Sequence, residues 1–253
     1  MLNKVICVIP VRMESSRFNG KPLSLYKGKT LIENAILNAK KLDFVDKIIV
    51  ASGSDDNQIK LICKEQEVEL LFQKEMYNSG SERLRGVREH YPDFETFMTI
   101  PIDEPSIDPL EVNRVYDEHG PFNGIVTLYS NFYNKGDVVN PNSCKIVMSG
   151  DRINYTSRAI IPSSKSGGYY SDLSVYKRHV GVFFFPSFLL FAFGDFLWKE
   201  DDNARIESLE QNNFLAQGLY AYKIRHNGFG IDIASDNRKL EERMVETYFK
   251  EKI

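Results

Sequence analysis

A group of cations follows the first predicted strand, at the point where the strand gives way to a loop. The strand covers residues 5–10. The next dozen residues place three cations among small side chains, and these cations are Arg12, Arg17 and Lys21. Open α/β sheets bind ligands just beyond the carboxyl ends of their strands, which is where this loop lies. The loop therefore predicts a phosphate site, in which the cations neutralise a polyphosphate and the charge on its leaving group.

The same loop offers backbone amides around Ser16 and Gly20 that can hold phosphate oxygens. It is not a Walker loop, because Pro22 follows Lys21 and no glycine lies five residues before Gly20. A solvated basic loop without a ligand is the alternative interpretation of these residues.

The composition is that of a globular protein that handles a small molecule. A chain of 253 residues with 42% hydrophobic content can bury one sizeable core. We therefore expect a single domain over residues 1–253, with a small inserted lobe or dimerisation extension at roughly residues 130–185. The net charge of −3 and the absence of a dominant basic block argue against a nucleic-acid or membrane surface.

Two apolar stretches are too short to span a bilayer, which needs about 20 residues. Residues 1–11 lack a cleavage site of small residues, and Pro186 interrupts residues 180–193. The three cysteines, Cys7, Cys63 and Cys144, form no Cys-x-x-Cys pair, which argues against a disulfide framework or a zinc site. These features predict a cytoplasmic protein with free, buried thiols.

Hydrophobic periodicity predicts alternating strands and helices over the first half of the chain. Short β-rich runs predict strands at residues 5–10, 47–51, 69–72, 97–100 and 124–129. Apolar residues at three-to-four spacing predict helices at residues 31–41, 55–67, 81–90 and 109–118, with Asp55 and Asp108 as two of the caps. This order is typical of an α/β fold in which helices cover a parallel sheet.

The second half of the chain is less regular. It predicts strands at residues 144–148, 152–155, 178–185 and 220–224, and helices at residues 206–218 and 236–250. Residues 162–174 are rich in Ser, Gly and Tyr without periodicity, which indicates a loop. The aromatic run 183–185 fits the core or a subunit interface. The predicted layout is α/β: a Rossmann-like, doubly wound, mostly parallel sheet with an antiparallel extension.

Several motifs resemble those of one enzyme family and keep the family's order. Residues 9–23 resemble the amino-terminal signature of sugar-nucleotide cytidylyltransferases, which reads Pro-Ala-Arg, Ser-x-Arg and Pro-Gly-Lys-Pro-Leu. Within that superfamily the chain is most similar to the 3-deoxy-manno-octulosonate (KDO) cytidylyltransferases, also called CMP-KDO synthetases. Further segments resemble the Ser-Gly-Thr-Glu-Arg, Asp-Glu-Pro, Asn-Pro-Asn-x-x-Lys, Tyr-Phe-Ser-Arg-Ala-x-Ile-Pro, Arg-His-Leu-Gly-Ile, Leu-Glu-Gln and Gly-Val-Asp motifs, and they lie at residues 79–83, 103–105, 140–145, 155–162, 178–182, 209–211 and 230–232.

The resemblance implies a fold of the nucleotide-diphospho-sugar transferase type, a homodimer, and CMP transfer from CTP to the anomeric hydroxyl of an acidic sugar. It implies Mg2+ held by Asp103 and Asp232, since that ion takes one or two carboxylates together with phosphates and waters. It makes Arg12 and Lys21 catalytic as well as nucleotide-binding. The other implied nucleotide-binding positions are Ser16, Arg17, Ser52, Ser79, Gly80, Ser81 and Arg83. The implied sugar-binding positions are Arg158, His179, Glu210 and Gln211.

Each of these positions also has a plain structural interpretation. A lone aspartate at a strand end, such as Asp103, is by itself more typical of a helix cap or a turn. A histidine on an apolar strand, such as His179, is by itself more typical of the core. An arginine such as Arg158 suits a sugar carboxylate, because its planar fork makes two parallel hydrogen bonds.

The chain departs from the family at several positions. Pro101 and Ile102 replace Gln-Gly and offer no side-chain hydrogen bond to a sugar hydroxyl. Gly53 replaces an aspartate near the predicted base site, and Asn19 replaces a proline. A different small acidic acceptor and a noncatalytic nucleotide-binding homologue therefore remain alternatives. A nucleotide-sugar glycosyltransferase is a third, although residues 103–105 are not an Asp-x-Asp metal motif.

Overall fold

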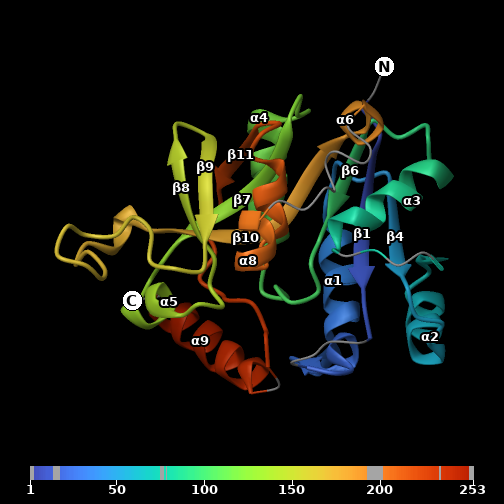
Figure 1. Cartoon of the computed structure of the whole chain (residues 1–253). Coiled ribbons are helices and arrows are strands. Elements are labelled where there is room, and N and C mark those ends of the chain that lie inside the picture. The colour runs from blue at the N-terminus through green and yellow to red at the C-terminus, as the bar shows by residue number, and fades with distance from the viewer. Residues whose placement is uncertain are drawn as a thin grey trace.

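A nine-stranded sheet forms the centre of the computed structural model, which describes residues 3–13, 18–74, 77, 79–192, 202–233 and 235–250 (Figure 1). The strands follow one another across the sheet in the order β5-β4-β1-β6-β10-β7-β11-β9-β8. Their bounds are β1 Val5–Val11, β4 Lys47–Ser52, β5 Glu69–Phe72, β6 Thr96–Thr99, β7 Ile125–Asn131, β8 Lys145–Ser149, β9 Arg152–Ser157, β10 Lys177–Pro186 and β11 Leu219–Lys223. A separate small hairpin pairs β2 Leu25–Tyr26 with β3 Lys29–Thr30.

Helices and short 3-10 turns connect the strands. The α-helices are α1 Leu31–Ala39, α2 Asn57–Glu65, α3 Leu84–His90, α4 Pro109–His119, α5 Lys135–Val139, α6 Ser187–Ala192, α8 Asp202–Glu207 and α9 Asp236–Lys250. The 3-10 helices are η1 Lys21–Leu23, η2 Ser81–Arg83, η3 Leu173–Val175 and η4 Glu210–Phe214. Asp108 caps α4 as predicted, but α2 is capped by Asp56 rather than Asp55. Across the described part of the chain, no helix has the length and apolarity needed to cross a bilayer.

Alternating side chains of β1 enter two separate apolar cores, one on each face of the sheet. Val5, Cys7 and Ile9 belong to the core that includes residues of α1, α2 and α4. Ile6 and Val8 belong to the core that includes residues of α3 and α6. Successive side chains of a strand point to opposite faces, so a strand covered on both faces is apolar throughout. This arrangement confirms the predicted helical layers on both faces.

The sheet contains more antiparallel pairing than the sequence predicted. β5, β4, β1 and β6 are parallel neighbours, but β10 lies between β6 and β7 and is antiparallel to both. β8 and β9 add an antiparallel hairpin at the far end of the sheet (Figure 1). The prediction of a mostly parallel sheet with an antiparallel extension is therefore wrong for the middle of the sheet. A strand buried on both faces has the same apolar pattern in either direction, which is why the pattern did not reveal its polarity.

The predicted helix over residues 206–218 is wrong as well. α8 ends at Glu207, Ser208 adopts a left-handed conformation with φ of 51°, and η4 begins at Glu210. The guanidinium of Arg158 donates hydrogen bonds to the carbonyl oxygens of Glu207 and Ser208 at 2.5 and 3.1 Å. Arg158, just after β9, therefore binds carbonyl oxygens that would accept hydrogen bonds within a continuing helix, and the chain turns instead. The predicted helix over residues 236–250 is confirmed as α9, although Val245 and Phe249 lie where side chains are not described.

Candidate active site

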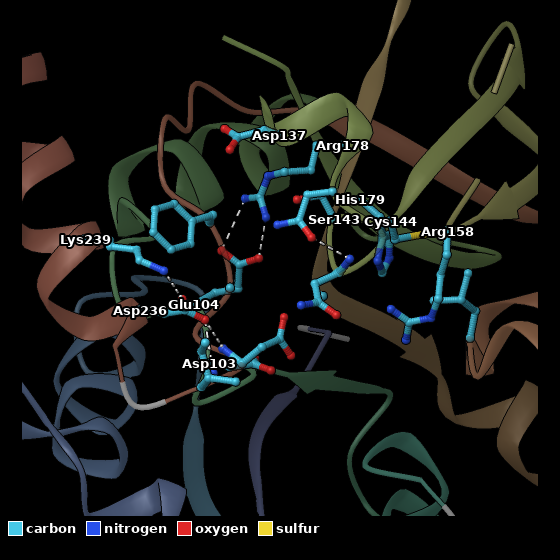
Figure 2. A pocket seen from close by; sticks show the side chains of 18 of the residues that line it. Asp103, Glu104, Asp137, Ser143, Cys144, Arg158, Arg178, His179, Asp236 and Lys239 are labelled. Atoms are coloured by element: carbon cyan, nitrogen blue, oxygen red, sulfur yellow. Dashed lines mark hydrogen bonds and ion pairs between the residues drawn. The ribbon is translucent and has the colours of Figure 1, made fainter. Parts of the chain in front are cut away.

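A cavity of about 640 Å³ lies where the loop after β6, the strand β10, the segment after β11 and the helix α9 meet (Figure 2). Residues from all four parts of the chain line it, among them Asp103, Glu104, Arg178, His179, Asp232 and Lys239. Charged and polar groups dominate this lining. The cavity therefore suits a polar ligand that carries several hydrogen-bonding groups.

Asp103 and Asp232, predicted as metal ligands, lie on neighbouring segments of this cavity. The amide of Ile231 donates a hydrogen bond of 2.8 Å to the carbonyl oxygen of Asp103. The amide of Asp232 in turn donates to Oδ2 of Asp236, at the start of α9, at 3.0 Å. Two aspartates that are 129 positions apart in the chain thus line the same cavity, held by one backbone hydrogen bond and one bond to the side chain of Asp236.

Lys21, predicted to bind phosphate, reaches the same edge. Its Nζ lies 3.1 Å from Oδ2 of Asp103, and the lysine side chain is only 15% exposed. Gly20 has a positive φ of 69° and donates from its amide to the carbonyl oxygen of Met13 at 3.1 Å. Glycine adopts this left-handed conformation without steric penalty, and Pro22 then pre-sets the first turn of η1. The loop closure therefore directs Lys21 toward Asp103.

The donor set at this edge fits magnesium. Within the described ranges, no three His, Cys, Asp or Glu side chains gather into a complete metal site. Magnesium does not need one, because it binds through one or two carboxylates and takes its other ligands from substrate phosphates and water. Asp103 and Asp232 supply that number of carboxylates in the cavity.

A second cavity of about 450 Å³ brings predicted nucleotide-binding and sugar-binding positions together. Its lining includes Arg12, Ser79, Gly80, Glu210 and Gln211. The hydroxyl of Ser81, beside this cavity, donates to Oε1 of Glu210 at 3.0 Å. The predicted nucleotide loop and the predicted sugar-binding Glu210 are therefore in direct contact.

The remaining predicted nucleotide positions differ in their surroundings. The hydroxyl of Ser52 is buried and engaged within its own turn, since it donates to the carbonyl oxygen of Ser54 at 2.9 Å and accepts from the amide of Ser54 at 3.1 Å. Arg83 is buried as well, and its Nε has no hydrogen-bond partner in the described part of the chain. Burial, followed by repulsion from Arg12, lowers the pKa of Arg83. Ser16 and Arg17 lie outside the described residues.

His179, a predicted sugar-binding residue, is neutral in the first cavity. Burial is the main reason that the pKa of His179 is lowered to about 4. Its Nε2 lies 2.8 Å from Oγ1 of Thr127, and that hydroxyl also lies 2.7 Å from the carbonyl oxygen of Val182. A hydroxyl has a single proton to donate, and the carbonyl can only accept. Nε2 of His179 is therefore the donor to Thr127, which leaves Nδ1 as a hydrogen-bond acceptor.

Arg158 is anchored by the protein itself. Its Nε, Nη1 and Nη2 donate to the carbonyl oxygens of Glu207, Pro141 and Ser208. A guanidinium has five N–H groups, so two are left for a ligand. Arg158 and His179 line the first cavity, whereas Glu210 and Gln211 line the second, and Leu209 lines both. The structure thus divides the four predicted sugar-binding residues between two cavities.

Three buried side chains, Glu104, Arg178 and His226, form a group that was not predicted from the sequence. Arg178 donates to the carboxylate of Glu104 with both Nη atoms, at 2.6 and 3.2 Å, and His226 Nε2 lies 3.0 Å from Oε2 of the same carboxylate. Burial raises the pKa of Glu104, but the attraction of Arg178 and the bond from His226 outweigh it and lower the pKa to about 2. Glu104 and Arg178 stand beside predicted site residues in the sequence, which was the available signal. The pairing of Glu104 with Arg178, 74 positions apart, could not be recognised in the sequence.

Lys145 was also missed as part of the site. Its side chain is fully buried, and Nζ donates to the carbonyl oxygens of Asn140, Ser143 and Arg158 at 3.0, 2.8 and 2.6 Å. Burial lowers the pKa of Lys145 to about 8. The lysine thereby fixes the loop that lines the first cavity to the backbone of Arg158.

Known proteins resemble this chain over nearly all of its length. The sequence profile of the family described as cytidylyltransferase matches residues 6–225. The 3-deoxy-manno-octulosonate cytidylyltransferase of Fusobacterium nucleatum is 30% identical over 90% of this chain and 92% of its own length. The enzyme of that name from Protochlamydia amoebophila is 29% identical over 96% of this chain and 95% of its own length. A solved structure of CMP:2-keto-3-deoxy-manno-octonic acid synthetase complexed with CTP, 24% identical, superimposes with a TM-score of 0.82 over 96% of this chain and 99% of its own.

The family match over most of the chain shows that the protein is a nucleotidyltransferase, the class of enzyme that transfers a nucleoside monophosphate from its triphosphate. Because the sequence match covers nearly the whole chain, the family within this class can also be stated. The chain belongs to the cytidylyltransferase family, among the 3-deoxy-manno-octulosonate cytidylyltransferases, and is a CTP-dependent enzyme.

Proposed function

We propose that the enzyme transfers CMP from CTP to the anomeric hydroxyl of KDO and releases pyrophosphate. The observation that carries the proposal is the cavity lined by Asp103, Asp232 and His179, together with the ion pair between Lys21 and Asp103. The curated relatives named 3-deoxy-manno-octulosonate cytidylyltransferase align with 90% and 96% of this chain. The order of the motifs in the sequence supports the same reaction.

We assign magnesium to Asp103 and Asp232. Bound there, the ion would lower the pKa of the attacking hydroxyl and neutralise the phosphates. The chain's own contribution is to keep the two carboxylates close, through the bond from the amide of Ile231 to the carbonyl oxygen of Asp103. Lys21 gives up its contact with Asp103 when CTP enters and donates to phosphate oxygens, where it balances the charge of the leaving pyrophosphate.

We assign the nucleotide to the region around the second cavity. Arg12 lines that cavity, and the buried guanidinium of Arg83 lies close enough to Arg12 for the two to repel one another. Two cations that repel in the free protein favour an anion between or beside them. Ser79, Gly80 and Ser81 offer amides and hydroxyls that suit the carbonyl and amino groups of cytosine. Ser16, Arg17 and Ser52 are proposed to bind the nucleotide from the sequence pattern alone.

We assign the acceptor to the first cavity. His179 offers Nδ1 as an acceptor for a sugar hydroxyl, and Arg158 has two N–H groups for the carboxylate of the sugar acid. Glu210 and Gln211 line the second cavity, and we propose that they contact the acceptor from the side of the nucleotide. The carboxylate of Glu210 already accepts from Ser81, and Nε2 of Gln211 lies 3.2 Å from Sγ of Cys144.

A different small acidic acceptor is the second candidate. A Cβ added to Gly181, which lines the first cavity, would lie 3.4 Å from Cγ of Pro101, so that proline lies directly behind the cavity wall. Ile102 belongs to the apolar core. Neither side chain can donate a hydrogen bond to a sugar hydroxyl. Neither residue lines the cavity or replaces the hydrogen bonds that the family's Gln-Gly can make, so an acceptor that needs fewer hydroxyl contacts is the second candidate.

The experiment is a pyrophosphate-release assay with CTP or UTP against a panel of acidic sugars that includes KDO. We expect release with CTP and KDO and little with UTP. Faster release with another sugar acid would select the second candidate. CTP binding without turnover on any acceptor would identify a noncatalytic homologue. Turnover of a nucleotide sugar without consumption of CTP would identify a glycosyltransferase.

We also propose a homodimer that works in the cytoplasm. Three side chains are about half exposed or more: Tyr133 after β7, Val139 at the end of α5 and Tyr170 in the loop after β9, which suits a contact with a second copy. Cys7, Cys63 and Cys144 are free thiols, as is usual in a reducing compartment. Sedimentation velocity at several protein concentrations tests the dimer.

A further inference from the structure

The buried group of Glu104, Arg178 and His226 joins three segments that each carry a predicted site residue. Glu104 follows Asp103 directly, Arg178 precedes His179, and His226 lies on the segment that leads to Asp232. All three side chains are at most 8% exposed. One carboxylate thus connects the loop after β6, the strand β10 and the segment after β11 at the wall of the first cavity (Figure 2).

Three hydrogen-bond contacts hold the carboxylate of Glu104. Oε1 accepts from Nη1 of Arg178, and Oε2 accepts from Nη2 of Arg178 and interacts with Nε2 of His226. A buried carboxylate held in this way keeps its rotamer, and so does each partner. Glu104 is therefore oriented toward its two partners, although it lies next to a predicted metal ligand in the sequence.

The packing around His226 shows that the segment after β11 is tightly constrained in its position. A Cβ added to Gly228 would lie 2.1 Å from Oγ of Ser106 and 2.7 Å from Cε1 of His226. A side chain at position 228 would displace Ser106 or His226, so Gly228 lets the segment after β11 pack directly against the side chain of Ser106 in the loop after β6. Four residues after Gly228, Asp232 enters the cavity. A change in the bond between His226 and Glu104 would therefore displace Asp232 relative to Asp103.

We propose that Glu104 is a positioning residue of the transfer reaction: through Arg178 and His226 it sets the distance between the metal-binding carboxylates of Asp103 and Asp232 and the orientation of His179. This inference rests on the proposed function. Side chains that orient metal ligands typically change metal affinity about 10- to 100-fold when they are replaced. Glu104 acts on affinity for the metal and on turnover. Because Glu104 lines the first cavity, whereas Ser79 and Gly80 line the second, affinity for metal-free CTP should be kept.

The test compares Glu104→Gln with the wild type by electron paramagnetic resonance titration of Mn2+ into the enzyme–CTP complex, and by calorimetric titration of CTP without metal. We expect the Kd for Mn2+ to rise about tenfold and the Kd for metal-free CTP to change less than about twofold. Pyrophosphate release with KDO should fall at least about tenfold in kcat. A purely structural role would lower the melting temperature but leave the Kd for Mn2+ unchanged, which would overturn the proposal.

Two variants of His226, one conservative and one apolar, test the same positioning role. His226→Gln keeps an N–H that can reach Glu104 and should retain an Mn2+ affinity within about threefold of the wild type, whereas His226→Leu should reproduce the loss in Glu104→Gln. Complete loss of Mn2+ binding in Glu104→Gln together with wild-type binding in His226→Leu would mean that Glu104 ligates the metal itself, which also overturns the positioning role.

Glu69→Gln is the control. Glu69, on β5, pairs with Lys47 and accepts from the hydroxyl of Tyr91, and it lines neither of the two cavities. We expect it to lower the melting temperature and leave the Kd for Mn2+ unchanged. If the wild type releases no pyrophosphate with KDO, the proposed function fails, and the Mn2+ and CTP titrations still decide the role of Glu104.

Discussion

The ammonium group of Lys21 lies 3.1 Å from Oδ2 of Asp103, so the predicted phosphate loop and the predicted metal edge are in contact before any ligand arrives. Lys21 is thus the cation that balances the charge of Asp103, whose side chain is 39% exposed. An incoming nucleotide offers Lys21 stronger partners, because phosphate oxygens carry more charge than a single carboxylate. The contact thus links nucleotide binding to the exposure of Asp103.

Replacing Asp103 by Asn should leave the fold intact, because the side chain is partly exposed and the backbone bond from Ile231 remains. Turnover should fall at least about 10²-fold, the scale seen when an electrostatic stabiliser of a transition state is lost. Pyrophosphate release and circular dichroism measure the two effects. Asp172→Asn, an exposed cap outside both cavities, is the control and should stay at the wild-type rate. A folded Asp103→Asn enzyme with near-normal turnover would contradict the metal assignment.

Lys21→Met should raise the KM for CTP about tenfold or more, because a cation that balances the triphosphate is lost. The melting temperature should change little, since a single partly exposed ion pair contributes at most about 1 kcal/mol. Initial-rate kinetics at varied CTP, with KDO held saturating, measure the effect. If the KM for KDO rises and that for CTP does not, Lys21 belongs to the acceptor site instead.

Stability should decrease as the pH falls below about 6.5. Burial holds His179 neutral in the folded chain down to a pKa of about 4, and burial also lowers the pKa of His226. The unfolded chain protonates both groups near their ordinary value, so it binds more protons in this window and is favoured there. Each group changes the free energy of unfolding by up to about 1.4 kcal/mol per pH unit.

Urea unfolding at pH 4.5, 5.5, 6.5 and 7.5 measures how the free energy of unfolding changes with pH. His179→Gln removes one of the two groups, so its free energy of unfolding should depend less steeply on pH than that of the wild type. Parallel slopes for the two proteins would show that His179 is not held neutral by the fold.

Gly228→Ala should destabilise the protein by about 1–3 kcal/mol, because the added Cβ would overlap Oγ of Ser106 at 2.1 Å. Gly230→Ala is the control in the same segment, since a Cβ there meets its nearest neighbour at an ordinary 3.7 Å. Thermal unfolding of both variants tests the contrast. Equal melting temperatures would mean that the segment after β11 can move away from Ser106 without loss.

Local patterns predicted the elements of the first half and several of their ends. Asp108 before Pro109 marked the start of α4, and the apolar run in β1 marked a strand covered on both faces. Both signals lie within a few residues of the feature that they specify, so a single sequence carries them. The helix predicted over residues 206–218 failed because its end depends on Arg158, which is 49 or 50 positions away and captures the carbonyls of Glu207 and Ser208.

The sequence by itself indicated the class of chemistry, through a family resemblance whose motifs contain Arg12, Arg17, Lys21, Asp103 and Asp232. Only the tertiary structure decided how these groups meet: Lys21 against Asp103, Glu210 against Ser81, and Glu104 between Arg178 and His226. The physical reason is that residue type sets charge and hydrogen-bonding capacity locally. Which donor reaches which acceptor depends on strand order and polarity, above all on β10 entering the sheet antiparallel between β6 and β7.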